Sequence, residues 1–225
     1  MTTTTVNLKP TKAYKGIAME GFIARWYART ARRDQEFVSL ARQVGETVAA
    51  GGHVLEVAPG PGFLSIEIAK LGKYQVTGLD ISQTFVEIAQ AAARQANVQI
   101  EFRLGNASAM PFADTQFDFI ICTAAFKNFS QPVQAIAEMH RVLKAGGKAL
   151  IADLRRDASR ANIDRMVAEM NLNRVNAFLT RGAFHWMLLK SAYTPDEIRQ
   201  LVAQTSFRKC DIHSNTVGMD IWLTK

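Results

Sequence analysis

Residues 53 to 62 read His-Val-Leu-Glu-Val-Ala-Pro-Gly-Pro-Gly, and this stretch decides the fold of the chain. The apolar residues around Glu56 predict a buried parallel strand with both faces covered. Gly60 and Gly62 allow a tight turn in which the backbone approaches a ligand closely, because neither residue carries a Cβ. Apolar residues at helical spacing over 63–71 predict a helix whose free N–H groups face that ligand. A tight turn that binds nothing would show the same pattern, so the flanking segments decide between the two readings.

Further strands and helices alternate along the rest of the chain. Residues 75–79 predict a second strand that stops at Asp80, roughly twenty residues after the glycines, where doubly wound folds place a carboxylate on ribose hydroxyls. Ser82 can cap the helix that follows. The remaining expected elements are strands at 98–103, 117–122 and 148–153 and a helix over 132–143. Five strands alternating with helices predict a parallel α/β sheet.

The last third of the chain predicts an insertion and two closing strands. Residues 161–178 have the apolar spacing of one helix, and an apolar cluster follows at 184–189. Thr194-Pro-Asp-Glu197 is a strong helix start with a capping box. Strands are expected at 207–213 and 217–224. We therefore predict one domain over 1–225, with a helical N-terminal cap at 1–50 and a helical lid inserted at 154–192 after the fifth strand.

From Glu56 to Asp153, and again at the C-terminus, the chain resembles class I S-adenosylmethionine-dependent methyltransferases. It is most similar to the small-molecule branch, methyltransferase type 11, which includes the quinone-biosynthesis enzymes. The matching pieces are Glu56-Val-Ala-Pro-Gly-Pro-Gly62, Asp80, Gly105-Asn-Ala107, Met110-Pro-Phe112, Phe117-Asp118 and Val142-Leu-Lys-Ala-Gly-Gly147. The resemblance implies a doubly wound, seven-stranded and mostly parallel sheet of order 3-2-1-4-5-7-6, whose last strand runs antiparallel.

The resemblance also implies where the cofactor S-adenosylmethionine binds. Glu56 would accept from the methionine ammonium, Asp80 from the ribose hydroxyls, and Asn106 would fix the adenine edge. The full implied set is Tyr27, Glu56, Ala58, Pro59, Gly60, Gly62, Asp80, Ile81, Asn106, Ala107 and Thr123.

Catalytic residues are not assigned by the resemblance, and three side chains are candidates. Tyr27 would close over the methionine end of the cofactor, or serve only in helix packing. Asn128 follows the fourth strand but can also bond the loop backbone. His185 could act as a base within the lid, or be a surface or packing residue. Tyr14 and Tyr193 are further candidates.

Three positions depart from the family pattern. Ala58 stands where the first glycine of the loop is usual, which indicates a position that tolerates a methyl group. Asn106 replaces the usual aspartate and keeps a carbonyl acceptor without the charge. Residues 125–129 read Ala-Phe-Lys-Asn-Phe where many relatives have a polar, histidine-rich segment. The chemistry on the acceptor side is therefore left open.

Composition limits the location of the protein. The chain has 225 residues, and no apolar run approaches the ~18 residues that a membrane-spanning helix needs. The N-terminus lacks the basic and then apolar order of a secretory signal. Cys122 and Cys210 fall in expected strands as buried thiols, and no metal-ligand spacing occurs. These features favour the cytoplasm and predict no metal.

The positive charge of the chain is unevenly distributed. The net charge is +7, and lysine and arginine exceed the acids by eight to four over 1–52 and by seven to three over 154–190. A nucleic-acid substrate would explain a basic face, and solvated helix faces explain it equally well. No basic run is interleaved with stacking aromatic residues, which argues against nucleic acid.

The resulting functional prediction is in-line methyl transfer from S-adenosylmethionine to a small, aromatic or lipid-like acceptor. We expect residues 1–35 and 155–190 to close over the strand ends and enclose an apolar chamber, with lining residues Phe126, Phe129, Phe184, Trp186 and Met187. Two alternatives stay open: an RNA or tRNA methyltransferase, and a cofactor-binding protein of this fold that does not methylate.

Overall fold

The computed structural model describes residues 14–15, 19–30, 34–169, 174–184 and 188–225. Its centre is a seven-stranded sheet of order β3-β2-β1-β4-β5-β7-β6. Every neighbouring pair is parallel except those of β7, which runs antiparallel to β5 and to β6. The expected sheet order and the antiparallel last strand are confirmed. The strands are β1 His53–Val57, β2 Gln75–Asp80, β3 Glu101–Leu104, β4 Phe117–Thr123, β5 Leu143–Leu154, β6 Lys209–Ser214 and β7 Gly218–Thr224.

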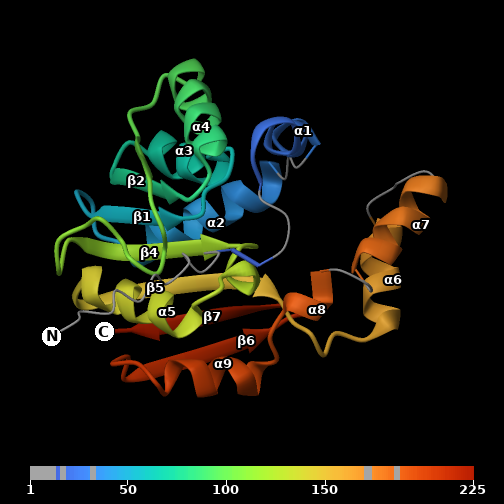
Figure 1. Ribbon diagram of the computed structural model, residues 1–225. Coiled ribbons are helices and arrows are strands. Elements are labelled where there is room, and N and C mark those ends of the chain that lie inside the picture. The colour runs from blue at the N-terminus through green and yellow to red at the C-terminus, as the bar shows by residue number, and fades with distance from the viewer. Residues whose placement is uncertain (1–13, 16–18, 31–33, 170–173, 185–187) are drawn as a thin grey trace, which may run out of the picture.

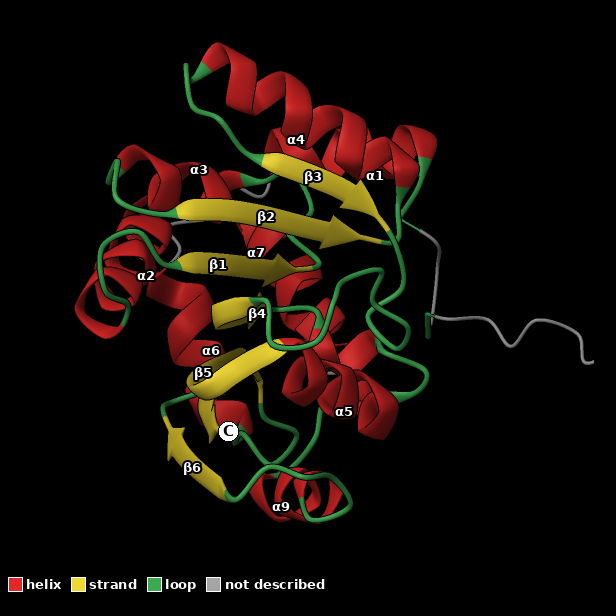
Figure 2. Ribbon diagram, turned by 90° about the vertical axis from the view of Figure 1, so that its left-hand side faces the viewer, coloured by secondary structure: helices red, strands yellow, loops and turns green. Residues whose placement is uncertain are grey.

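Helices cover both faces of the sheet (Figures 1 and 2). One face packs on α2 (Asp34–Thr47), α3 (Phe63–Lys70) and α4 (Gln83–Gln95), and the other packs on α5 (Pro132–Val142) and α9 (Pro195–Val202). Successive residues of β1 alternate between these two cores, because side chains of a strand point to opposite faces. This three-layer arrangement explains why the apolar run of β1 is unbroken by exposed residues.

The C-terminal ends of the parallel strands meet at one edge of the sheet, and the remaining helices stand beyond that edge (Figure 1). They are α1 (Gly21–Thr30), α6 (Arg160–Glu169), α7 (Arg174–Ala183), the short α8 (Leu189–Ser191) and the 3-10 turn η1 (Phe126–Asn128). In open parallel sheets this edge is where ligands bind. The fold therefore places α1 on one side of the candidate site and the pair α6–α7 on another.

Several expected elements differ from the structure. The fifth strand covers Leu143–Leu154 instead of 148–153, and the sixth covers Lys209–Ser214 instead of 207–213. The third strand begins at Glu101 instead of Val98, because its pairing with β2 starts only at Thr77. Val98 instead packs, partly buried, in the cluster of apolar residues beneath α4. The expected single helix over 161–178 is wrong: α6 ends at Glu169, and α7 begins at Arg174.

The helix α7 turns back along α6. The Nε atom of Arg181 lies 3.2 Å from Oδ1 of Asp164, which requires the two helices to run side by side in opposite directions. This hairpin buries a small apolar cluster of its own around Ile163 and Val167, joined by Phe184 and Leu189. One continuous helix could not have brought these residues together, since it would have carried 178 far beyond 163.

The expected start of α9 is confirmed. The Thr194 hydroxyl accepts from the backbone N–H of Glu197, and the Glu197 carboxylate accepts from the backbone N–H of Thr194. Both donors would otherwise lack a helical partner, so the capping box fixes where the helix begins.

Candidate functional site

The loop after β1 holds two glycines with different surroundings. Gly60 has a φ of 54°, and a Cβ built on it would meet no atom within 4 Å. Gly62 has a φ of 79°, but a Cβ there would lie 2.9 Å from both Ala89 Cβ and Phe102 Cζ. The space beside Gly62 is therefore filled by the protein, and only the space beside Gly60 is open to a ligand.

Ala58 adopts the backbone conformation that glycine adopts more readily. Its φ is 58°, and its N–H donates to the carbonyl of Leu79 at 2.8 Å. A left-handed conformation costs a residue with a Cβ about 1 to 2 kcal/mol, which the surrounding contacts must offset. The chain thus keeps the turn of a glycine loop at this position despite the methyl group.

Two buried carboxylates flank this loop. Glu56, at 2% exposure, accepts from the Ser65 hydroxyl, and burial raises its pKa to about 7. Asp80, at 5% exposure, accepts from the backbone N–H groups of Gly60 and Ser82, each at 2.9 Å. Burial raises the pKa of Asp80 as well.

Neither carboxylate forms an ion pair with a lysine or arginine among the residues that the structure describes. Burying an acid without a compensating cation disfavours its ionised form, which is the physical cause of both raised pKa values. A cationic ligand bound here would supply the missing charge. The pair Glu56 and Asp80 therefore favours a ligand with positive charge over an anionic one.

The opposite wall of this region comes from the ends of β2 and β3. Ile81 follows Asp80 and is 41% exposed. The Asn106 Oδ1 atom accepts from the backbone N–H of Ser108 at 2.9 Å, so it holds its own loop in shape. Ala107 packs partly buried against the core. The side-chain amide nitrogen of Asn106 is the part that differs from an aspartate at the same place.

A buried ion pair joins the ends of β4 and β5. The Lys127 ammonium lies 2.8 Å from Asp153 Oδ1, and the two side chains are 4% and 3% exposed. Asp153 also accepts from the backbone N–H groups of Lys127 and Leu154, and the Lys127 ammonium donates to the carbonyl of Ala124 at 2.6 Å. The pair was not predicted: Asp153 appeared in the sequence only as the last residue of a strand.

A short N-terminal segment, the strap formed by the described residues 14 and 15, crosses this edge. Tyr14 pairs with Phe129 as an isolated bridge, and the Lys15 N–H donates to the carbonyl of Asn128 at 2.7 Å. The Lys15 ammonium donates to the Tyr193 hydroxyl at 2.9 Å. The strap thus lies across η1 and is fixed to Tyr193, which directly follows the expected lid segment 154–192.

Tyr14 lies over the candidate site. Burial raises the pKa of its phenol, and the charges of Asp80, Tyr27 and Asp153 raise it further. Tyr14 is thus near enough to the acids that end β2 and β5 for their charges to act on its phenol. Because the pKa is raised, the phenol stays protonated near neutral pH and acts as a hydrogen-bond donor.

The start of helix α1 contacts the start of α4. The Glu20 carboxylate accepts from the backbone N–H groups of Gln83 and Thr84 at 3.0 and 3.2 Å. Tyr27 packs edge-to-face on Phe85 with ring centroids 6.0 Å apart. A carboxylate at a helix N-terminus is favoured by the helix dipole, so Glu20 anchors α1 beside Asp80.

The other sequence candidates are placed as follows. Asn128 contributes its backbone carbonyl to the strap, and His185 lies outside the described residues. Thr123 ends β4 opposite Ala152 of β5. The thiol of Cys122 has a pKa raised well above its usual value by burial, with Asp153, Glu56, Lys127 and Asp80 all acting on it electrostatically. The ends of β2, β1, β4 and β5 lie next to one another along one edge of the sheet.

The expected apolar chamber is not lined as predicted. Phe126 and Phe129 are 1% and 7% exposed and pack on each other in the main core, where Phe126 also contacts Tyr193. Phe184 lies in the small cluster of the lid. Phe126 and Phe129 are part of the main core because η1 folds back onto the sheet instead of standing above it. Trp186 and Met187 fall outside the described residues.

Comparison with known proteins decides the family. A family model described as a methyltransferase domain, Methyltransf_11, matches residues 55–151, from β1 through most of β5. The chain belongs to the class I S-adenosylmethionine-dependent methyltransferases. The edge described above is therefore the candidate active site of this methyltransferase.

Individual relatives agree with this membership. A demethylmenaquinone methyltransferase of Deinococcus radiodurans is 28% identical over 69% of this chain and 67% of its own length. The O-methyltransferase resE of Aspergillus sclerotiorum is 29% identical over 84% of this chain and 70% of its own. The crystal structure of an S-adenosylmethionine-dependent methyltransferase from Aquifex aeolicus shares the fold, with a TM-score of 0.69 at 15% identity over 91% of this chain and 99% of that one.

The residues of this methyltransferase fit its cofactor. S-adenosylmethionine carries a sulfonium and an ammonium, and the buried Glu56 and Asp80 need positive charge nearby. The open space beside Gly60 leaves room for a ligand against the loop. Within the described part of the chain, no helix is long and apolar enough to span a bilayer.

We predict that Asp80→Ala weakens S-adenosylmethionine binding by about 1.5 to 3 kcal/mol, the scale for hydrogen bonds to a charged acceptor. The variant also leaves the N–H groups of Gly60 and Ser82 without their acceptor, so the loop loses its support. Isothermal titration calorimetry beside a thermal melt measures both effects, with the exposed Asp114→Ala as the control. Unchanged affinity in folded Asp80→Ala would remove Asp80 from the cofactor site.

Proposed function

We propose that this methyltransferase acts on a small aromatic or lipid-like acceptor with a phenol- or enol-type hydroxyl. The observation that carries the proposal is a group of tyrosines from three distant segments, the strap, α1 and the end of the lid. Tyr14, Tyr27 and Tyr193 all stand at the edge where the strands end. Aromatic side chains favour flat, apolar ligands, and their hydroxyls add a few directed hydrogen bonds.

The relatives support the same class of acceptor. The matching curated proteins include methyltransferases named for demethylmenaquinone and for ubiquinone biosynthesis. Both names refer to quinones, which combine an aromatic head with an apolar tail. A quinol-like acceptor is therefore the first class of compound to test on this chain.

The binding roles are those that the family resemblance implies, and the positions of the side chains support them. Bound S-adenosylmethionine supplies an activated methyl group. Glu56 would accept from the methionine ammonium, Asp80 from the ribose hydroxyls, and Ile81 would contact the adenine. The backbone at Thr123 would lie near the sulfonium, and Tyr27 would cover the methionine end. The contribution of the chain to rate is then to hold the acceptor in line in a water-poor site.

The acceptor side holds one ammonium group, which is paired with a carboxylate. The Lys127 ammonium is buried just after β4, fixed by Asp153 and by the Ala124 carbonyl. An acceptor hydroxyl that gives up its proton to solvent before the transfer would be stabilised as an oxyanion by this ammonium and by the Tyr14 hydroxyl, and the oxygen becomes neutral as the methyl group bonds to it. This arrangement favours a phenolic or enolic acceptor over an amine, whose reacting nitrogen becomes positive.

The proposal is tested with methyl-labelled S-adenosylmethionine and a panel of acceptors. We expect labelled product and S-adenosylhomocysteine with a prenylated naphthoquinol, less with the same quinol lacking its tail, and none with bulk RNA or with an alkylamine of similar size. Transfer to RNA, or cofactor binding without transfer to any member of the panel, would contradict the proposal. Asp80→Ala serves as the binding-deficient control for every acceptor.

A further inference from the structure

The outward face of α1 is apolar where a solvent-facing helix is normally polar. Phe22 is 79% exposed, Trp26 58% and Ile23 41%. They are three of the six large apolar residues that are exposed in the described part of the chain, and they lie on one helix of ten residues. Isolated exposed apolar residues are common, but a contiguous group of this kind marks an interaction surface.

The same face is basic. Arg25 and Arg29 are exposed. Arg25 follows Phe22 by three residues and Arg29 follows Trp26 by three, so each arginine neighbours an aromatic residue on the helix surface. Residues 21–33 contain four arginines and no acidic residue. A helix with aromatic residues and arginines on its outer face and no negative charge matches the boundary between lipid headgroups and acyl chains.

The face cannot turn inward to bury its apolar residues. Ala24, on the opposite side of α1, is fully buried, and Tyr27 packs on Phe85. The Gly21 N–H donates to the Thr84 hydroxyl, and Glu20 holds the start of α4. The helix is thus fixed at both its beginning and its inner side, and Phe22 and Trp26 stay exposed on its outer side.

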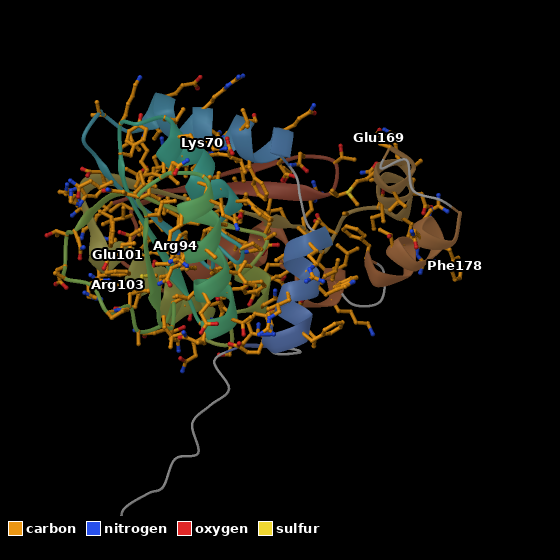
Figure 3. The ribbon with its side chains drawn as sticks, turned by 90° about the horizontal axis from the view of Figure 1, so that it is seen from above. Lys70, Arg94, Glu101, Arg103, Glu169 and Phe178 are labelled. Carbon is orange, nitrogen blue, oxygen red and sulfur yellow. The ribbon has the colours of Figure 1, made fainter. Side chains whose placement is uncertain are left out.

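The location of this face fits contact with an extended surface. The helices α1 and α7 both stand beyond the C-terminal edge of the sheet (Figure 1). Phe178 of α7 is 74% exposed, and Figure 3 shows it at the end of the molecule opposite to Arg94 and Glu101. Two projecting elements at one edge therefore carry exposed aromatic residues.

We propose that the outer face of α1, formed by Phe22, Ile23, Arg25, Trp26 and Arg29, docks on an anionic lipid bilayer. The aromatic rings enter the interface, while the guanidinium groups contact lipid phosphates. The ten-residue helix is about 15 Å long and lies along the bilayer without crossing it. The inner face of the same helix borders the cofactor region, so docking would place the active-site edge against the bilayer. The inference does not depend on the identity of the acceptor.

The test is sedimentation of the full chain with vesicles in the absence of cofactor. We expect the chain to bind phosphatidylcholine vesicles that contain about 30 mol% phosphatidylglycerol, a moderately anionic surface. Binding to pure phosphatidylcholine should be at least about tenfold weaker, and binding to the anionic vesicles should weaken as salt is added. Replacing both aromatic residues, Phe22→Ser with Trp26→Ser, should weaken binding about a hundredfold, because two large apolar side chains no longer enter the interface. Replacing Arg25→Gln with Arg29→Gln should remove most of the preference for anionic vesicles.

Matched controls lie on other surfaces. Leu104→Ser removes an apolar side chain that is 52% exposed at the end of β3, and Arg94→Gln with Lys73→Gln removes two exposed charges. These variants should bind vesicles as the unmodified chain does, and thermal melts should show all variants folded. Absence of vesicle binding, or equal binding after Phe22→Ser with Trp26→Ser, would overturn the proposal. A concentration-dependent dimer that this double variant dissociates would overturn it too, and would assign the face to a second copy of the chain.

Discussion

Gly60→Val is expected to abolish S-adenosylmethionine binding while leaving a folded protein. A Cβ at Gly60 meets no protein atom within 4 Å, so we expect the methyl groups of valine to extend into the open space that the cofactor needs. The φ of 54° disfavours valine, and this strain lowers the free energy of unfolding by about 2 kcal/mol. Calorimetry should show at least about a hundredfold loss of affinity, since a close backbone approach is blocked completely.

Gly146→Val provides the matched control. Gly146 has a φ of 75° and equally open surroundings, but it lies in the irregular start of β5, between Leu143 and Lys148, at the opposite edge of the sheet. Both variants carry similar backbone strain, and only Gly60→Val should lose the cofactor. Gly62→Ala completes the series, because its methyl group collides with Ala89 and Phe102 and should destabilise the fold itself. Normal binding by Gly60→Val would mean that the turn only connects β1 to α3.

Glu56→Gln is expected to weaken cofactor binding by about 10- to 100-fold at about pH 7.5, which is above the pKa of the Glu56 carboxyl. The substitution should also remove the dependence of cofactor binding on pH. Burial raises the pKa of Glu56 to about 7, so below this pH the acceptor for the methionine ammonium is protonated. Affinity should therefore rise by up to about tenfold per pH unit toward pH 7 and then level off. Calorimetry between about pH 5.5 and 7.5 keeps most of the amino group of the cofactor protonated, because α-amino groups titrate near 8.

The same carboxylate affects the stability of the cofactor-free protein. A carboxyl whose folded pKa is raised contributes most below its ordinary value of 4.5, and this contribution is lost as pH rises through about 7. The free energy of unfolding should fall by about 3 kcal/mol across that interval, and Asp80 adds to the loss in the same sense. Glu56→Gln should flatten the profile, whereas Glu67→Gln, a more exposed position on α3, should leave it unchanged. An unaltered profile in Glu56→Gln would contradict the assigned pKa.

Local patterns were sufficient to predict the sheet. The apolar run of β1, the turn at Gly60 and the capping box at Thr194 each depend on neighbouring residues, and the structure has all three. The family resemblance added the order of the strands. The start of β3 was missed because it depends on where β2 offers partners, which the apolar pattern of 98–103 does not contain.

The lid and much of the site depend on contacts between distant residues. The break between α6 and α7 follows from burial of Ile163 beside Phe184, a contact that helical spacing alone cannot indicate. The ion pair of Lys127 with Asp153 joins two strand ends whose proximity follows only from the sheet order. The available signal for this ion pair was an acid, Asp153, as the last residue of an expected strand. A rule that pairs such an acid with a lysine in the loop after the neighbouring strand would have predicted the pair.

The contact between Lys15 and Tyr193 has a consequence for synthesis of the chain. These residues are 178 positions apart, and the hydrogen bond between them closes nearly the whole sequence into one loop. A ribosome adds residues from the N-terminus at about 5 to 20 per second, so the strap waits for its partner for about 10 seconds or longer. During that interval the β1–α3 glycine loop can already fold, but the cover over it cannot assemble. The contact of the strap can thus form only after Tyr193 has been synthesised.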